Sequence, residues 1–420
     1  MRSEKWARGF ALGVLIAGWV PAQVAAQARR SIAVSPDSAV STIHAAHDRA
    51  RDGDTIRILP GRYQEPELRV TRRVTILGQG WPVLVGGDHQ VLTVTADSVE
   101  IEGLEIRDVT PSSTDDRAGI KVLDAKGCRI EGNHLFDTFF GIYLSRVSGC
   151  AVRGNLVQGK LASEVFSGNA IHSWSSNDLV IEGNVVRGHR DGIYFEFTTR
   201  AQVRGNTSTG NLRYGLHFMF SNDCTYERNT FADNGSGVAV MYSKQVTMQG
   251  NRFADNRGGA SYGLLLKEIT DSRIERNIFE RNSVALYGEG TNRVGIVGNQ
   301  FLENGWAVEI MGDADRTTFQ RNRFEGNSFD VSTNSVHASS QFVENYWDRY
   351  TGYDLDGDGY GDVPFAPVRL FAFMVQRNPP ALILLRSFFV SVLDAAERVA
   401  PVLTPEAMQD RRPLMRWPSQ

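Results

Sequence analysis

Imidazole and thioether side chains recur at matching places of a short motif in the middle of the chain. His172, His217, Met219 and Met241 each lie two or four residues after the glycine or alanine that begins the motif. These groups are soft or borderline ligands that suit Cu(I), and Glu196, at an equivalent place, could orient a histidine. Packed methionines and hydrogen-bonded structural histidines are the alternative interpretation. The pattern predicts a copper-binding surface made of these five residues.

Carboxylates at alternate positions form a second candidate site, near the C-terminal end of the repeats. Asp354, Asp356 and Asp358 are followed by Asp362, and a glycine comes after the third carboxylate. This arrangement matches the first half of a calcium-binding loop. The glutamate that completes an EF-hand is replaced by Phe365, so an acidic turn without a metal is the alternative. We expect the four aspartates to hold a hard cation, Ca²⁺ first, in a structural role.

The candidate ligands lie within a repeat that is marked by an asparagine. Ten asparagines follow short stretches of alternating polar and apolar residues, at intervals of 22 to 29 residues. They are Asn133, Asn155, Asn184, Asn206, Asn229, Asn251, Asn277, Asn299, Asn322 and Asn345. A period of this length indicates a solenoid, in which each repeat stacks on its neighbours. Leucine-rich repeats share the period, but the leucine frame that they require is absent.

Each repeat contains one strand before the asparagine and another about eight residues after it. Strands stacked once per repeat give a right-handed parallel β-helix, an all-β fold that we expect over residues 27–364. Asparagine tolerates the left-handed backbone of a sharp bend, and stacked asparagine side chains can form a hydrogen-bonded ladder. The ten asparagines are therefore interpreted as structural. Ser38–Arg51 is expected to be a short helix that caps the first coil.

The strand that follows the motif glycine has one apolar face and one chemically unusual face. Residues one and three positions after the glycine should lie in the core, and residues two and four positions after it should point outward. The outward positions hold aromatic residues, histidines and methionines, which usually mark a binding surface. Glu196 has no acidic partner there, although Glu289 and Glu309 fall in adjacent coils. This surface favours binding over the paired-carboxylate chemistry of a glycoside hydrolase.

The three cysteines are too few for a disulfide framework in a chain of 420 residues. Cys128, Cys150 and Cys224 each lie five residues before a repeat asparagine, at inward positions. We interpret them as small buried apolar residues. Cys128 and Cys150 occupy adjacent coils, so a disulfide between them remains an alternative in an oxidising compartment.

The N-terminus has the features of an export signal. Three basic residues precede the apolar stretch Gly9–Val20, and small residues follow it. We therefore expect a signal peptide over residues 1–26, cleaved near Ala26, and a location in the periplasm or outside the cell. ATP-driven chemistry within the chain is then not expected. The formal net charge of −3 does not fit a basic nucleic-acid binder.

After Pro364 the repeat stops, and residues 365–420 are expected to form a helical segment. Asn378, Pro379 and Pro380 break the chain, and Ala381–Val399 is expected to be a helix with bulky apolar side chains. Part of it should cap the last coil, but its bulk exceeds what a cap needs. We expect the remainder to dock on a partner, and the tail through Arg416 could extend that contact. The candidate docking residues are Leu385, Phe388, Phe389 and Val392.

Four segments of the chain carry a family resemblance. They are GLHFMFSND (Gly215–Asp223), GVAVMY (Gly237–Tyr242), NYWDRYTGYDLDGDGYGDVPF (Asn345–Phe365) and ALILLRS (Ala381–Ser387). Together they resemble the NosD family of periplasmic maturation proteins for nitrous oxide reductase, and the resemblance covers nearly the whole mature chain. It implies a right-handed β-helix that works with an ATP-binding-cassette ATPase and a membrane permease, at the periplasmic side of the inner membrane. It also implies copper–sulfur cluster insertion into the reductase, with a lipoprotein copper chaperone as donor.

Three functions compete for this sequence. The first is a non-enzymatic periplasmic module that relays Cu(I) transiently and couples a transporter to its client, as denitrification requires of this family. The second is a polysaccharide lyase, hydrolase or epimerase, because the groove of a long β-helix suits chain-like sugars. The third is a passive adhesion solenoid, which leaves the soft outward side chains unexplained. We favour the first.

Overall fold

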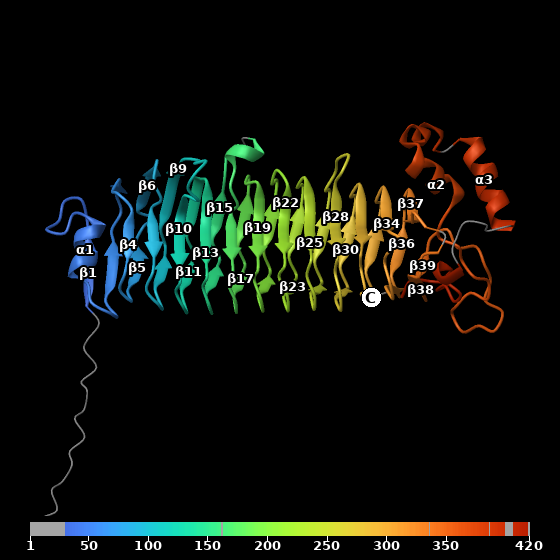
Figure 1. Cartoon of the computed structure of the whole chain (residues 1–420), viewed down its shortest axis with the longest axis horizontal. Coiled ribbons are helices and arrows are strands. Elements are labelled where there is room, and N and C mark those ends of the chain that lie inside the picture. Colours follow the sequence, from blue (N-terminus) through green and yellow to red (C-terminus); the bar gives the residue numbers. More distant parts are fainter. Residues whose placement is uncertain (1–29, 161–162, 336, 386, 400–405, 419–420) are drawn as a thin grey trace, which may run out of the picture.

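The structure is a computed structural model that describes residues 30–160, 163–335, 337–385, 387–399 and 406–418. The predicted signal peptide lies outside these residues. Short strands form three parallel sheets of 14, 13 and 12 strands, which wind around one continuous core (Figure 1). Each coil passes through sheet 1, sheet 2 and sheet 3 in turn. The predicted parallel β-helix is confirmed.

The strands stack in coil order in all three sheets. Sheet 1 contains β1 (Ser31–Val34), β2 (Thr55–Ile58), β5 (Thr75–Gly78), β8 (Glu100–Glu102), β11 (Arg129–Glu131), β14 (Ala151–Arg153), β17 (Val180–Glu182), β20 (Gln202–Arg204), β23 (Thr225–Glu227), β26 (Thr247–Gln249), β29 (Arg273–Glu275), β32 (Gly295–Val297), β35 (Thr318–Gln320) and β38 (Gln341–Val343). Sheet 2 contains β3 (Arg62–Tyr63), β6 (Val83–Gly87), β9 (Glu105–Val109), β12 (His134–Thr138), β15 (Leu156–Gln158), β18 (Val185–Arg187), β21 (Thr207–Thr209), β24 (Thr230–Ala232), β27 (Arg252–Ala254), β30 (Ile278–Glu280), β33 (Gln300–Leu302), β36 (Arg323–Glu325) and β39 (Tyr346–Trp347). Sheet 3 contains β4 (Leu68–Val70), β7 (Leu92–Val94), β10 (Ala118–Leu123), β13 (Phe140–Ser145), β16 (Ile171–Trp174), β19 (Asp191–Glu196), β22 (Tyr214–Met219), β25 (Ser236–Met241), β28 (Tyr262–Lys267), β31 (Val284–Glu289), β34 (Trp306–Ile310) and β37 (Phe329–Ser332).

The repeat asparagines form the predicted ladder at the bend between sheets 1 and 2. All ten side chains are buried. The amide N–H of Asn206 donates to Oδ1 of Asn229 at 2.9 Å, and its Nδ2 donates to the same oxygen at 3.0 Å. The same pair of bonds joins the other asparagines along the ladder, for example Asn229 to Asn251. These bonds satisfy backbone groups that a buried bend would otherwise leave unpaired.

A second ladder, which the sequence analysis did not predict, follows the bend between sheets 2 and 3. Its members are Asn211, Asn234, Asn256, Asn282, Asn304 and Asn327, all of them buried. The N–H of each member donates to Oδ1 of the next at 3.0 to 3.2 Å. Asparagine ladders therefore hold two of the three bends in these coils. The second ladder keeps successive strands of sheets 2 and 3 in register on either side of its bend.

The cysteines are buried as predicted, but two of them are bonded. Cys128 and Cys150 form a disulfide between adjacent coils, with their Cα atoms 4.6 Å apart. The interpretation of these two as simple apolar residues is therefore wrong, because stacking brings equivalent positions of neighbouring coils within bonding reach. Cys224 is free and buried. Burial raises its pKa to about 12, so this thiol stays protonated at neutral pH and behaves as an apolar core residue.

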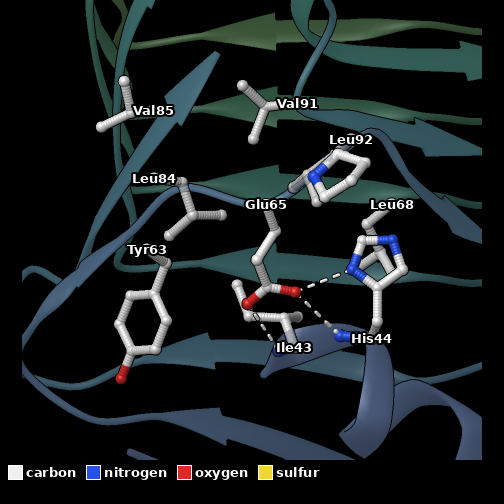
Figure 2. A pocket seen from close by; sticks show the side chains of 10 residues that line it. Ile43, His44, Tyr63, Glu65, Leu68, Leu84, Val85, Val91 and Leu92 are labelled. Carbon is white, nitrogen blue, oxygen red and sulfur yellow. Dashed lines mark hydrogen bonds and ion pairs between the residues drawn. The ribbon is translucent and has the colours of Figure 1, made fainter. Parts of the chain in front are cut away.

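The helix at the N-terminal end is shorter than predicted. The expected Ser38–Arg51 helix is reduced to α1, Ile43–Arg49. Thr42 is its N-cap and accepts from the N–H of Ala45, and the distant Glu65 adds hydrogen bonds from the N–H groups of Ile43 and His44 and from Nδ1 of His44 (2.7 Å). Figure 2 shows this carboxylate between α1 and the apolar side chains of the first coils. A carboxylate at this place satisfies the unpaired donors of the first turn.

The C-terminal tail closes the opposite end of the solenoid. Asp410 is fully buried and occupies the place of the next ladder asparagine, since its Oδ2 accepts from the N–H (2.8 Å) and Nδ2 (3.1 Å) of Asn345 and from Nε1 of Trp347 (3.1 Å). Met408, in the short turn η3 (Glu406–Met408), joins the main core. Residues 406–416 therefore act as the cap of the last coil. The tail, which the sequence analysis considered as an extension of the partner contact, makes a structural contact within the chain.

The predicted helix Ala381–Val399 is divided. Pro379–Leu384 is the 3₁₀ helix η2, and the α-helix α3 spans Phe388–Val399. The chain turns at Leu385, whose ψ of 127° is incompatible with a continuous helix. The turn lets Leu385 pack against a small cluster that joins helix α2 (Leu370–Arg377) to Phe329 of β37. Helices α2 and α3 lie together beside the last coils (Figure 1).

Removing the carboxylate that ends the ladder should destabilise the solenoid. We expect Asp410→Ala to lower the free energy of unfolding by roughly 3 kcal/mol, because several buried donors would lose their acceptor. Thermal and urea denaturation of the mature protein would measure this. Glu406→Ala is the matched control, since its side chain is 83% exposed. Equal melting of both variants would show that the tail does not support the last coil.

Candidate functional site

The predicted outward positions of sheet 3 form two columns of side chains, here called the stripe. Strand register places residues of successive coils directly over one another. The first column runs Tyr143, His172, Tyr194, His217, Ala239 and Leu265, and the second runs Ser145, Trp174, Glu196, Met219, Met241 and Lys267. The predicted core positions are also confirmed, since Ile193 and Phe195 between these columns are fully buried.

The first column is less exposed than an outward position suggests. His172 is 8% exposed and His217 is 5% exposed, because aromatic neighbours cover them. The rings of Tyr143, His172 and Tyr194 stack at 4.4 and 4.9 Å between centroids, and Tyr194 meets His217 edge to face at 5.0 Å. The sequence indicated the direction of these side chains, but it did not indicate that they cover one another.

His172 and His217 are separated by the coil that carries Tyr194. Two coil steps amount to about 9–10 Å, so the two imidazoles belong to different neighbourhoods. His172 Nδ1 lies 3.0 Å from Nδ2 of Asn169, which can only donate, so this nitrogen accepts. Burial and then the charge of Arg190 lower the pKa of His172 to about 3. This imidazole is therefore neutral at any pH near neutrality.

His217 has one ring nitrogen that could bind a ligand. Its Nε2 is buried and has no hydrogen-bond partner. Its Nδ1 lies 3.3 Å from Nη2 of Arg213 and 3.8 Å from Oδ2 of Asp191. Small Ala239 follows it in the column. A buried nitrogen without a partner is costly unless something else binds it.

Met219 and Met241 are paired across adjacent strands in the second column. Adjacent strands lie about 4.8 Å apart, which brings the two thioethers within reach of one small ion. Met219 and His217 alternate on β22, so both side chains lie on the same side of the strand. The hydroxyl of Tyr194 donates to Sδ of Met219 at 3.7 Å. His217, Met219 and Met241 thus lie on the outward face of two adjacent strands.

Glu196 is a neighbour of a methionine and not of a histidine. Register pairs it with Trp174 on one side and Met219 on the other. Burial and then the charge of Glu196 raise the pKa of Tyr194 to about 12, so the phenol remains a hydrogen-bond donor. The structure gives the role of histidine neighbour to Asp191 and Arg213, which the sequence analysis did not single out.

Three exposed aromatic rings, also missed from the sequence, border the methionine pair. Phe197, Phe220 and Tyr242 each follow the last residue of their strand, and their rings stack at 5.2 and 5.1 Å between centroids. Each has a positive φ near 50° and is 40 to 49% exposed. The same left-handed bend recurs in neighbouring coils, for example at Arg146 and Ser175, so the conformation belongs to the repeat and the rings themselves distinguish these three coils. The sequence did contain a signal for this cluster, because three successive coils carry an aromatic residue at the same repeat position.

Glu289 and Glu309 lie on adjacent strands, as predicted. Their surroundings differ. Oε1 of Glu289 lies 3.4 Å from Nζ of Lys267, and its Oε2 accepts from the Tyr287 hydroxyl at 3.2 Å. Burial raises the pKa of Glu309 to about 7. A hollow of about 480 Å³ lies next to Tyr287 and Glu289. Glu289 therefore has charged and hydroxyl partners, whereas burial favours the neutral form of Glu309.

The acidic loop brings three of its four candidate ligands together. Asp354, Asp356 and Asp358 offer oxygens within 4.8 Å of one another, the single such group among histidine, cysteine and acidic residues in the part of the chain that is described. Asp362 is not part of this group, and its Oδ2 accepts from the N–H of Leu355 at 2.7 Å. Asp358 also pairs with Arg412 at 2.6 Å. The loop is therefore joined to the C-terminal cap.

The candidate docking residues are mostly exposed. Phe388 is 84% exposed, Phe389 46% and Val392 48%, whereas Leu385 is partly buried against the Phe329 cluster. Ile383, 88% exposed, extends the same apolar surface onto η2. None of the helices in the described segments is long and apolar enough to span a membrane.

Known proteins match this chain in sequence and in fold. A family model described as "Periplasmic copper-binding protein (NosD)" matches residues 157–358. A Pseudomonas aeruginosa protein described as "Probable ABC transporter binding protein NosD" is 29% identical over 355 residues, which cover 80% of this chain and 82% of the relative. A Stutzerimonas stutzeri protein with the same description is 26% identical over 383 residues, with 80% of both chains covered.

Solved structures agree with the fold. The catalytic unit of a GH87 α-1,3-glucanase from Streptomyces thermodiastaticus has a TM-score of 0.57 and 15% identity, covering 80% of this chain and 68% of that chain. At this identity the likeness concerns the fold alone. The segment matched by the family model includes the part of the stripe from His172 to Met241 and the three clustered aspartates. Together with the two sequence relatives, it confirms the resemblance that the motifs indicated: the chain is similar to the NosD proteins.

Proposed function

We propose that this chain is a periplasmic accessory protein that binds Cu(I) transiently and relays it to the copper–sulfur cluster of nitrous oxide reductase. The observation that carries the proposal is the buried, unpartnered Nε2 of His217 on the same sheet face as the paired residues Met219 and Met241. One imidazole and two thioethers are a donor set that favours Cu(I) over the harder divalent ions. The family description as copper-binding agrees with this donor set.

Transient binding suits this arrangement. A site of three ligands on one face of a sheet leaves the metal open to exchange with an incoming donor, such as the lipoprotein copper chaperone. The exposed rings of Phe197, Phe220 and Tyr242 provide an apolar border for such an exchange. His172, with its own neutral imidazole two coils away, is then a secondary contact along the column. Glu196 supplies negative charge beside Met219.

We further propose that the chain performs no catalysis and works with a membrane permease and its ABC ATPase. The descriptions of its relatives as ABC transporter binding proteins support this assembly. The exposed apolar side chains of η2 and α3 supply a docking surface outside the solenoid. Attachment to the permease through this surface would hold the protein at the periplasmic side of the inner membrane, close to chaperone and reductase.

The acidic loop is proposed to hold structural Ca²⁺. Its ligands are hard oxygens, which Ca²⁺ prefers and Cu(I) does not. Its backbone bonds to the tail, from Gly361 N–H to Pro413 (2.8 Å) and from Met415 N–H to Gly359 (3.0 Å), would transmit the stabilisation to the cap.

A glycan-active protein is the alternative function. Glu289, which lines a hollow, and Glu309 on the adjacent strand, whose pKa burial raises to about 7, are two carboxylates that could serve as an acid–base pair. An assay for polysaccharide cleavage separates the two functions, because only the alternative turns over a sugar substrate.

Replacing both thioethers should weaken copper binding. We expect Met219→Leu with Met241→Leu to lower Cu(I) affinity by about tenfold or more, since leucine keeps the volume but cannot ligate. Anaerobic competition with a Cu(I) chelator would measure it, with circular dichroism to verify the fold. Met248→Leu, in the buried core of β26, is the matched control. Unchanged affinity in the double variant would refute the site.

Calcium removal should loosen the loop and the tail. We expect a calcium chelator to lower the melting temperature of the wild type by a few degrees. Asp356→Asn should melt at the lower temperature with or without calcium, and it leaves the Asp358–Arg412 pair intact. Asp315→Asn, on an exposed turn, should respond to calcium as the wild type does. A wild-type melting curve that calcium does not move would identify the loop as a plain turn.

Polar substitutions on the apolar helix should release the transporter. We expect Phe388→Ser and Phe389→Ser, made singly, to reduce pull-down of the permease–ATPase pair, because an interface phenylalanine commonly contributes a few kcal/mol. The isolated variants should melt like the wild type, since both rings are exposed. Val185→Ser, an exposed apolar residue on sheet 2, serves as control. Normal pull-down by both folded variants would place the docking surface elsewhere.

A further inference from the structure

A buried carboxylate and an arginine converge on the nitrogen of His217 that does not face the proposed ligand position. Asp191 is fully buried on β19, and Arg213 immediately precedes β22. Nε of Arg213 donates to Oδ1 of Asp191 at 3.0 Å, and Nη2 donates to Oδ2 at 2.6 Å. The same Nη2 lies 3.3 Å from Nδ1 of His217. Asp191 also accepts from the N–H of Tyr214 at 3.2 Å.

The contact with Arg213 determines which nitrogen of His217 carries the proton. A guanidinium has only donors and is always charged in proteins, so Nδ1 of His217 must accept. In a neutral imidazole the proton then lies on Nε2. That Nε2 is the buried atom without a partner. In the present arrangement, therefore, the nitrogen that should bind Cu(I) has no free lone pair.

We propose that Arg213 gates His217 and that Asp191 positions it for metal binding, an inference that rests on the proposed copper site. On loading, Arg213 withdraws from Nδ1, and the proton of Nε2 is exchanged for one on Nδ1. Nδ1–H then donates to Oδ2 of Asp191, which is now 3.8 Å away, and Nε2 presents its lone pair to Cu(I). The exchange moves the ring proton from one nitrogen to the other and releases none.

The surroundings permit this exchange. The Arg213 side chain is 34% exposed and lies over the ring of Tyr214, so it can move toward solvent. Nε of Arg190 lies 3.9 Å from Oδ2 of Asp191 and continues to compensate the buried carboxylate. A carboxylate that receives the second N–H of a ligating histidine fixes the ring and raises its basicity. The gate thus links copper affinity to the position of one arginine.

The experiment compares two substitutions that should act in opposite directions. Asp191→Asn should weaken Cu(I) binding about 10- to 100-fold, the usual effect of losing such a partner. Arg213→Gln should tighten it several-fold, because the competing donor is removed. Affinity is measured by anaerobic chelator competition on the mature protein. Asp178→Asn and Arg200→Gln are the matched controls, since they alter an exposed pair with the same two-bond geometry (2.7 and 2.8 Å).

The tautomer of His217 gives a readout that a purely structural role would not change. In ¹⁵N NMR of histidine-labelled protein, the copper-free wild type should carry the proton on Nε2, and the Cu(I)-loaded protein should carry it on Nδ1. Arg213→Gln should show the Nδ1–H form without copper. These spectra need only the wild type and Arg213→Gln, so they decide the question even if Asp191→Asn does not fold.

Two results would overturn the gate. One is a His217 tautomer that copper leaves unchanged in a protein whose binding depends on Met219 and Met241. The other is a loss of Cu(I) affinity in Arg213→Gln that is as large as the loss in Asp191→Asn. A wild type that binds no Cu(I), or binds it independently of both methionines, would instead refute the proposed copper site. The two failures are therefore distinguishable.

Discussion

The hydrogen bond from each ladder asparagine to the next determines how every other residue of the solenoid is placed. It satisfies buried backbone groups at a sharp bend and holds successive coils in identical register. Because register is kept, a residue at a given repeat position lies directly over its equivalent in the next coil. Side chains 22 residues apart, such as Met219 and Met241, then become neighbours. Stacked core rings, for instance Phe279 on Phe301 at 5.0 Å, follow from the same alignment.

The same constraint explains the two ends. A ladder that stops leaves donors or acceptors unpaired in a buried place, and each end must supply a substitute. At the C-terminal end Asp410 supplies a carboxylate where the next asparagine amide would be. At the N-terminal end α1 covers the first coils, and Glu65 satisfies its first turn. Most of the apolar surface of α3 does not take part in capping the solenoid and is exposed.

Stacking also changes the chemistry of the stripe. Residues that would be solvated on an isolated strand cover one another, and His172 becomes a neutral imidazole with a pKa of about 3. Neutral, partly desolvated imidazole and thioether groups favour a soft monovalent metal ion over a hard divalent one. Burial requires that each remaining polar atom has a partner, and Nε2 of His217 is an exception. Copper bound to this nitrogen, as proposed, would resolve that exception.

The sequence alone determined the β-helix, the asparagine ladder, the core positions and the outward positions of the stripe. Those features depend on a local period, and alternation along a strand is visible without knowing what lies beside it. Only the tertiary structure decided that Glu65 bonds to the first turn of α1, that Leu385 divides the last helix, and that Cys128 and Cys150 are bonded. It also decided that Asp410 ends the ladder and that Arg213 and Asp191 meet at His217. These features depend on contacts between residues that lie far apart in sequence or in different coils. The exact register of the strands and the packing at the two ends determine which residues meet. A periodic sequence pattern does not encode either of them.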